Sequence, residues 1–404
     1  MGIRGKSSRV LIYSHDSFGL GHLRRCRAIA HSIVSHRPEA TVLILSGSPI
    51  IGSFGFRNRV DFVRIPGVIK LQNGDYISQA LNLATDETVA LRAAIVKQTA
   101  EAFAPDLVIV DKEPLGLRGE VTGMLETAKA RGARLVLGLR DVMDEPALLA
   151  PEWERKNVMP ALVDLYDEIW VYGLQQICDP LEGIDAPDIV RRKMTYTGYL
   201  RREESKIDHP FTSRWNEPFI LVTPGGGGDG EHLVDSVLRA YETDRFLPNP
   251  ALIVTGPFMQ SEQLARYVDR ASKLDNVEIL KFDSHLEDIM AQAAGVVAMG
   301  GYNTFCEILS FDKPALLVPR QTPRLEQTIR AERAAALGLV HTLNPVEAAS
   351  PSKMARAIQA LPLQQPPSSS VIPGLMEGLD NVNRLVDRAL DTARVTPLRQ
   401  RQTA

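Results

Sequence analysis

Cysteine is scarce in this sequence, and long apolar runs are missing from it. The three cysteines, Cys26, Cys178 and Cys306, lie far apart, and none belongs to a Cys-x-x-Cys pair. This spacing predicts neither a disulfide framework nor a zinc knuckle, and it fits a reducing cytoplasm. The apolar run at residues 10–13 is too short for a signal peptide or a membrane span, and no later segment reaches spanning length. A cytoplasmic location is therefore expected.

The sequence also has no excess of positive charge. Its 46 lysine and arginine residues stand against 49 aspartate and glutamate residues, which gives a formal net charge of -3 at pH 7. Proteins that bind nucleic acid carry basic surfaces that neutralise phosphates, so no nucleic-acid partner is expected. With 404 residues, 44% of them hydrophobic, the chain is long enough for two domains of about 150 to 200 residues.

Short apolar runs alternate with helical patterns, which is typical of a parallel, doubly wound sheet. The first half contains predicted strands at residues 9–13, 41–45, 106–111, 134–139, 168–172 and 193–197. The second half contains predicted strands at residues 219–223, 251–255, 277–281, 295–299 and 315–319. The pattern predicts two α/β domains.

Composition sets the expected domain boundaries. We expect an N-terminal domain at residues 1–200 and a charged, proline-containing linker at residues 201–218. A C-terminal domain is expected at residues 219–375. An apolar helical stripe predicts a last helix at residues 376–395, which we expect to pack toward the N-terminal domain. Each half opens with a strand, a glycine-rich loop and a helix, as two similar domains facing each other across a cleft would.

The first glycine-rich loop leads into a histidine. Gly19 and Gly21 follow the strand at residues 9–13, and His22 then lies in the first turn of a predicted helix. A helix N-terminus suits an anion, and it favours a neutral imidazole that can act as a base. An ordinary strand-to-helix turn with a structural His22 is the alternative. The loop lacks a complete Gly-x-Gly-x-x-Gly motif, so no dinucleotide is indicated.

Asp111 ends the predicted strand at residues 106–111. Its carboxylate could fix the tautomer of His22 through a second hydrogen bond, as in hydrolase triads. The alternatives are a helix cap or an ion pair with Lys112 or Arg140.

Four consecutive glycines open the second half. They lie between a strand and an amphipathic helix and cost chain entropy, which close approach to a diphosphate would explain. No Gly-Lys-Ser/Thr follows them, so the loop is not the P-loop of an NTPase. A flexible turn is the alternative. The four residues are Gly225, Gly226, Gly227 and Gly228.

A third glycine pair, Gly300 and Gly301, precedes a helix that is expected to begin at Thr304. In this helix Glu307 could accept two hydrogen bonds from a ribose diol. Thr304 and Glu307 also have the spacing of a capping box, in which Glu307 would only bond back to the backbone. The residues alone leave both interpretations open.

Together these motifs resemble the GT-B glycosyltransferases, most closely the branch of the lipid II N-acetylglucosaminyltransferase and the UDP-glycosyltransferases. The resemblance covers nearly the whole chain and is more specific in the second half. It implies an α/β fold of two Rossmann-like, doubly wound parallel-sheet domains facing across a cleft. It also implies inverting, metal-independent transfer of a hexosyl or N-acetylhexosaminyl group from a UDP-sugar to a hydroxyl acceptor, without a cofactor. The sequence contains no Asp-x-Asp, which fits independence from a metal.

The resemblance also implies roles for individual residues. His22 would be the catalytic base, supported by Asp111. Leu286 would offer backbone groups to the uracil, and Glu326 departs from the glutamine pair of the lipid II enzyme, which leaves the donor sugar open. The residues expected to bind the nucleotide-sugar are Gly21, Arg201, Gly225, Gly226, Gly227, Gly228, Leu286, Gly300, Gly301, Asn303, Thr304, Glu307, Glu326 and Gln327.

A second resemblance concerns the residues around His22. The sequence GLGHLRRC at residues 19–26 is similar to the start of the nucleotide-sugar hydrolases of pseudaminic acid synthesis. In those enzymes the matching histidine activates water. A hydrolase, an epimerase on the same scaffold and a non-catalytic nucleotide-sugar binding protein therefore stay open beside the transferase.

The acceptor is the least specified part of the site. Residues 50–71 mix aromatic and aliphatic side chains with three arginines and a lysine. Such a segment could rest on an anionic bilayer at the inner face of the cell membrane while a lipid-linked or cell-envelope precursor enters. The alternative is a strand with loops and solvated arginines.

Overall fold

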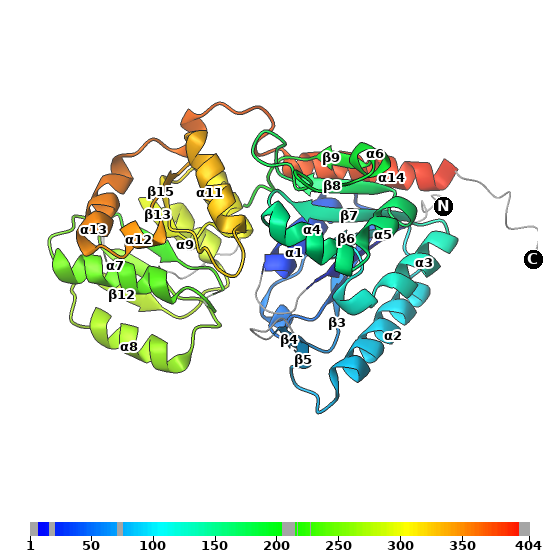
Figure 1. Cartoon of the computed structure of the whole chain (residues 1–404), viewed down its shortest axis with the longest axis horizontal. Coiled ribbons are helices and arrows are strands. Elements are labelled where there is room, and N and C mark those ends of the chain that lie inside the picture. Colours follow the sequence, from blue (N-terminus) through cyan, green and yellow to red (C-terminus); the bar gives the residue numbers. More distant parts are fainter. Residues whose placement is uncertain are drawn as a thin grey trace, which may run out of the picture. The chain divides into compact units, whose positions relative to one another are not determined.

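The computed structural model describes residues 7–15, 21–70, 76–203, 215, 217–226 and 228–395. The chain forms two compact α/β units, each built around its own parallel sheet (Figure 1). Unit 1 consists of Met1–Gln175, Asp179–Leu200 and Glu377–Ala404, and unit 2 consists of Gln176–Cys178 and Arg201–Met376. Most of the linker predicted at residues 201–218 lies outside the described residues.

The sheet of unit 1 has the strand order β3-β2-β1-β6-β7-β8-β9, with every neighbouring pair parallel. The order reverses between β1 and β6, and doubly wound sheets bind ligands at the carboxyl ends of strands at such a reversal. The strands are β1 (Ser8–Ser14), β2 (Ala40–Ser46), β3 (Val60–Arg64), β6 (Leu107–Asp111), β7 (Arg134–Arg140), β8 (Glu168–Tyr172) and β9 (Met194–Tyr196). A separate antiparallel pair is formed by β4 (Val68–Lys70) and β5 (Tyr76–Ser78).

Helices bury the central strands of this sheet. Every residue of β6 is buried, as expected for a parallel strand covered on both faces. The helices are α1 (Gly21–His36), α2 (Thr85–Phe103), α3 (Thr122–Ala130), α4 (Pro146–Arg155), α5 (Val158–Asp164), α6 (Asp188–Arg192) and α14 (Gly378–Val395). The last helix, α14, packs on α1, where Asn383 Nδ2 donates to Ser32 Oγ at 2.9 Å and Arg37 Nη1 donates to Asp387 at 2.7 Å.

The sheet of unit 2 has the order β12-β11-β10-β13-β14-β15, again fully parallel. This is the strand order of a dinucleotide-type Rossmann sheet, and it reverses between β10 and β13. The strands are β10 (Ile220–Thr223), β11 (Ala251–Val254), β12 (Val277–Leu280), β13 (Gly295–Ala298), β14 (Ala315–Leu317) and β15 (His341–Thr342). The helices are α7 (Glu231–Thr243), α8 (Ser261–Ala271), α9 (Leu286–Gln292), α10 (Tyr302–Ser310), α11 (Glu326–Ala336), α12 (Pro345–Ala348) and α13 (Pro351–Ala360).

The predicted fold class is confirmed, and each predicted strand coincides with an observed one. The sequence patterns missed β3, the β4-β5 pair and the short β15, which are edge strands or lie outside the main sheets. Among the described residues, no helix is long and apolar enough to cross a membrane.

The described part of the segment at residues 50–71, residues 50–70, contains β3, β4 and loops, in line with the second interpretation of a strand with loops. Phe54 is buried beneath the guanidinium of Arg27, whose Cζ lies 5.6 Å from the ring centroid. Arg59 Nη2 donates to Val34 O at 2.6 Å, at the end of α1. These side chains are engaged within unit 1, and membrane contact by the segment stays a prediction.

Candidate active site

His22 and Asp111 lie within hydrogen-bond distance at the point where the strand order of unit 1 reverses. His22 Nδ1 is 2.5 Å from Asp111 Oδ2. Since α1 begins at Gly21, His22 occupies its first turn, as predicted, and Asp111 is the last residue of β6. β1 and β6 pair directly, so their carboxyl ends place the two side chains together although 89 positions separate them in the sequence.

Arg25 completes this group, and the sequence analysis missed it. Its Nε donates to Asp111 Oδ1 and its Nη2 to Asp111 Oδ2, both at 2.7 Å. Both side chains are almost fully buried. Asp111 therefore pairs with Arg25, a cation that the sequence patterns did not suggest as its partner. Arg25 follows His22 by three positions, a helical spacing that puts both on one face and is the signal that could have found it.

The charges of this group fix the protonation state of His22. Burial alone would raise the pKa of Asp111, but Arg25 and the hydrogen bond from His22 hold it well below its usual range. An ionised carboxylate only accepts hydrogen bonds, so the proton in this bond belongs to His22 Nδ1. Burial lowers the pKa of His22, with Asp111 opposing and Arg25 contributing, so the imidazole is neutral at pH 7 with an unprotonated Nε2. Its side chain is 20% exposed.

A second histidine, also missed from the sequence, lies beside His22. The rings of His15 and His22 are 5.8 Å apart between centroids, in an edge-to-face arrangement. His15 follows β1 directly and is buried. Its Nδ1 lies 3.3 Å from the hydroxyl of Tyr13.

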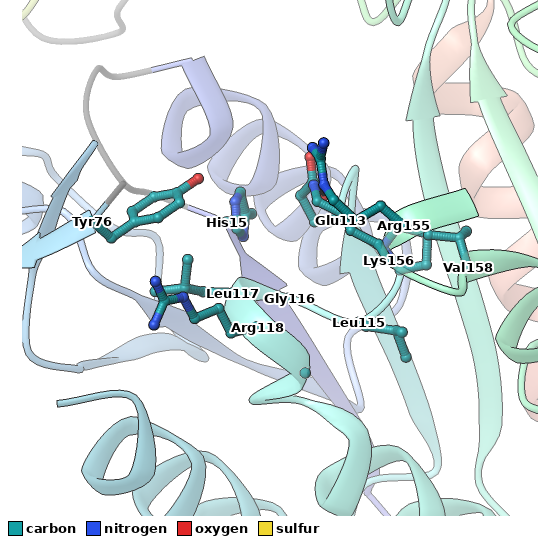
Figure 2. A pocket seen from close by; sticks show the side chains of 12 residues that line it. His15, Tyr76, Glu113, Leu115, Gly116, Leu117, Arg118, Arg155, Lys156 and Val158 are labelled. Carbon is teal, nitrogen blue, oxygen red and sulfur yellow. Dashed lines mark hydrogen bonds and ion pairs between the residues drawn. The ribbon is translucent and has the colours of Figure 1, made fainter. Parts of the chain in front are cut away.

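His15 lines a pocket of about 370 Å³ in unit 1 (Figure 2). Its volume is within the range of small-molecule sites, about 300 to 1,000 Å³. Polar and apolar side chains both contribute, and Glu113 in its wall accepts from Lys156 Nζ at 2.9 Å. The lining residues are His15, Tyr76, Glu113, Pro114, Leu115, Gly116, Leu117, Arg118, Gly119, Arg155, Lys156 and Val158. They come from the residue after β1, the start of β5, the segment after β6, the end of α4 and the start of α5.

In unit 2, the glycine-rich loop after β10 is held tightly against the loop after β11. Gly225 and Gly256 both have φ of +89°, a left-handed conformation that favours glycine. A Cβ on Gly256 would lie 2.4 Å from Gly225 O, so no larger residue fits there. Phe258 N donates to Gly226 O at 3.1 Å. Gly225, Gly226 and Gly228 thus follow the carboxyl end of β10, and Gly227 lies outside the described residues.

The next predicted group follows β13, the sheet neighbour of β10. Gly300 has φ of +79°, and Gly301 is the N-cap of α10. The helix therefore begins at Tyr302, two residues before the predicted start at Thr304. Because Glu307 then lies well inside the helix, the capping-box interpretation is wrong. Glu307 is fully buried in this structure, and its predicted role toward a ribose stays a prediction.

An arginine contacts this helix, but it is not the predicted one. Arg201 is exposed, whereas its neighbour Arg202 is buried. Arg202 Nη2 donates to Asn303 Oδ1 at 2.9 Å, and its backbone N–H donates to Ser310 Oγ at 2.8 Å. Arg202 thus ties the start of the predicted linker to α10.

Arg320 links the glycine-rich loop to the predicted sugar-contacting pair. Its guanidinium pairs with Asp229 of that loop, and its Nη2 lies 3.2 Å from Glu326 Oε1. Its backbone N–H donates to Gln327 Oε1 at 3.2 Å. Glu326 and Gln327 begin α11 and are buried, and Leu286 begins α9. The predicted contact of Leu286 with the uracil stays a prediction. Within the described ranges, no three His, Cys, Asp or Glu side chains gather as metal ligands would.

Comparison with known families identifies the C-terminal half. Residues 220–368 match the model of the glycosyltransferase family 28 C-terminal domain. This range contains all of the unit 2 sheet and its glycine-rich loops. No curated protein matches the sequence.

Several solved structures share the fold over nearly the whole chain. The calicheamicin glycosyltransferase CalG4 is 15% identical with a TM-score of 0.59, covering 96% of this chain and 100% of its own. MurG from Acinetobacter baumannii is 13% identical with a TM-score of 0.52, at 96% and 100% coverage. A putative UDP-N-acetylglucosamine 2-epimerase from Listeria monocytogenes is 12% identical with a TM-score of 0.61, at 96% and 97% coverage.

At these identities the structural matches establish the fold and not the substrates. The expectation of a GT-B fold, made from the motifs, is confirmed. The chain has the GT-B fold, and its residues 220–368 match the model of the glycosyltransferase family 28 C-terminal domain.

Proposed function

We propose that the protein is an inverting glycosyltransferase that moves a sugar from a UDP-sugar to a hydroxyl acceptor without a catalytic metal ion. The observation that carries the proposal is the hydrogen bond between His22 Nδ1 and Asp111 Oδ2 at 2.5 Å, next to a pocket in the same unit. A neutral imidazole held in this way has its Nε2 ready to accept a proton, as a general base requires.

The reaction follows from this arrangement. The acceptor oxygen attacks the anomeric carbon of the donor sugar, on the side opposite to the diphosphate. As the new C–O bond forms, the hydroxyl proton passes to His22 Nε2, and the bond from carbon to the diphosphate oxygen breaks with its electron pair. Asp111 then faces an imidazolium and stabilises it by charge and hydrogen bonding, as the carboxylate of a hydrolase triad does.

Unit 2 would hold the donor. Backbone amides of the loop containing Gly225 and Gly226 can donate to the diphosphate, and the N-terminus of α10 adds positive partial charge after Gly301. Such preorganised donors stabilise the departing diphosphate without covalent chemistry. Glu307 would accept from the ribose, and Glu326 and Gln327 would face the sugar, whose identity the pair leaves open.

A nucleotide-sugar hydrolase is the second candidate. The same His22 could deprotonate water instead of an acceptor hydroxyl, and the sequence GLGHLRRC resembles the hydrolases at this point. Epimerisation at C2 of the donor sugar is a third candidate reaction, because the fold is similar to that of a putative 2-epimerase.

Incubation with a panel of UDP-sugars, with and without a lipid acceptor extract, tests the proposal. UDP release that depends on the extract supports the transferase, and free sugar formed without it selects the hydrolase. Inversion at C2 of the donor sugar would select the epimerase. Binding of UDP without any turnover would contradict all three and leave a binding protein.

A further inference from the structure

A buried chain of polar side chains ends at His15 and is not used by the proposed mechanism. Arg92 binds Glu120 through two contacts, from Nε to Oε2 at 2.5 Å and from Nη2 to Oε1 at 2.7 Å. The hydroxyl of Tyr13 donates to Glu120 Oε1 in a short hydrogen bond. All three side chains are buried, at 3% exposure or less. The chain lies in unit 1 beside the site.

This chain determines the tautomer of His15. Tyr13 has a single hydroxyl proton, which goes to the carboxylate of Glu120, and burial raises the pKa of Tyr13 so that the proton stays on the oxygen. The Tyr13 oxygen can therefore only accept from His15. The 3.3 Å contact between them requires a hydrogen on His15 Nδ1, and it leaves Nε2 unprotonated.

The surroundings of His15 keep it neutral. Burial is the main cause that lowers its pKa to about 3, and the positive charges of Lys112 and Arg92 act in the same direction. Glu113 is the facing group that opposes them. No described residue bonds to Nε2 of His15, and His15 lines the pocket (Figure 2). Its ring lies 5.8 Å from that of His22 between centroids. Two neutral imidazoles, each with an unprotonated Nε2, therefore lie side by side.

Building on the proposed function, we propose that the acceptor is a polyhydroxylated molecule, a sugar or polyol, that is bound in this pocket at His15 and extends to the neighbouring His22, with one hydroxyl at each histidine. The reacting hydroxyl donates to Nε2 of His22, and a neighbouring hydroxyl donates to Nε2 of His15. An unprotonated ring nitrogen accepts from O–H groups, whereas a carboxylate or phosphate offers it no hydrogen. His15 thus selects an acceptor with a second hydroxyl close to the reacting one.

Two substitutions separate this role from a structural one. In His15→Asn the amide nitrogen replaces Nδ1 and can still donate to Tyr13, but nothing remains at the position of Nε2. In His15→Gln the amide extends to the Nε2 position, where its oxygen can accept. We expect His15→Asn to raise the acceptor KM about tenfold, the effect of one lost hydrogen bond, with UDP affinity unchanged, and His15→Gln to recover part of the loss. Equal losses in both variants would overturn the proposal.

A measurement without turnover keeps this test independent of the transferase proposal. Nitrogen-15 NMR of the histidine rings should show His15 protonated at Nδ1 in the wild type, and Tyr13→Phe should shift the tautomer toward Nε2–H. A wild-type His15 protonated at Nε2 would overturn the proposal.

The same spectra report binding. Methyl β-glucopyranoside is the probe, and cyclohexanol, with one hydroxyl, is its control. We expect the glucoside to shift the His15 Nε2 resonance and cyclohexanol to leave it unchanged. No response of His15 to the glucoside, or an equal response to both, would contradict the proposal. A His15 response in a protein that releases no UDP would count against the transferase alone.

Discussion

Arg25 donates hydrogen bonds to both carboxylate oxygens of Asp111, from Nε and Nη2, each at 2.7 Å. This bidentate pair is buried. Asp111 accepts a third hydrogen bond from Nδ1 of His22, in the first turn of α1. The geometry keeps Asp111 ionised and aimed at His22 Nδ1. Arg25 is therefore a positioning residue that acts on the base through Asp111.

Replacing Arg25 should affect stability and activity together. Arg25→Met leaves a buried carboxylate without its main counter-charge, so the free energy of unfolding should fall by about 3 to 5 kcal/mol. Urea denaturation measures this loss. Arg25→Met combined with Asp111→Leu should be more stable than Arg25→Met alone, because no unpaired charge remains. A single variant as stable as the wild type would show that the pair does not hold Asp111 ionised.

Asp111→Asn should abolish the base. The amide nitrogen can donate to His22 Nδ1 and would favour the tautomer with hydrogen on Nε2, which cannot accept a proton. We expect kcat to fall on the order of a thousandfold. The melting temperature should fall as well, because the buried Arg25 loses its counter-charge, so kcat is measured at a temperature at which the variant is folded. Turnover close to the wild-type rate would mean that Asp111 does not set the tautomer.

The lowered pKa of His15 predicts how stability depends on pH. In the unfolded chain His15 takes up a proton near pH 6.5, whereas in the folded protein burial delays this to about pH 3. The unfolded state therefore binds more protons between these values, and stability falls as pH falls, by about 1.4 kcal/mol per pH unit for one histidine. Denaturation midpoints between pH 7 and 5 should show a shallower decline in His15→Asn than in the wild type. Parallel curves would contradict the buried, neutral His15.

Glu307→Gln tests the predicted contact with ribose. The carboxylate accepts hydrogen bonds better than the amide, so UDP affinity should weaken about tenfold while the melting temperature is kept. Isothermal titration with UDP and a thermal melt give the two quantities. Because Glu307 is fully buried, the opposite pattern, lost stability with unchanged UDP affinity, would assign it to the packing of α10.

Local sequence patterns predicted the central strands, because central parallel strands are apolar runs. The His22–Asp111 pair was predicted because residues at the carboxyl ends of β1 and β6 meet once those strands are neighbours. Gly301 shows a limit: it caps α10, and nothing in the local pattern distinguished it from Thr304 as the residue that begins the helix.

The roles of Arg25 and His15 depended on contacts between segments that lie far apart in the sequence. Buried arginines are uncommon, and the spacing from His22 to Arg25 places both on one face of α1 without showing that Arg25 has a partner in β6. The tautomer of His15 depends on Glu120, which accepts the hydroxyl proton of Tyr13. Glu120 is 107 positions from Tyr13, and no motif connects it to Tyr13 or His15. Such networks become visible only when the sheet brings the segments together.

The most direct test of the account is the rate of UDP release by His22→Ala. It should be measured with the UDP-sugar and acceptor extract that support turnover in the wild type, alongside UDP affinity as the control for folding. Loss of the base predicts a rate lower by on the order of a hundredfold or more, with UDP affinity unchanged. Turnover near the wild-type rate would contradict the assignment of His22 as the base and, with it, the proposed mechanism.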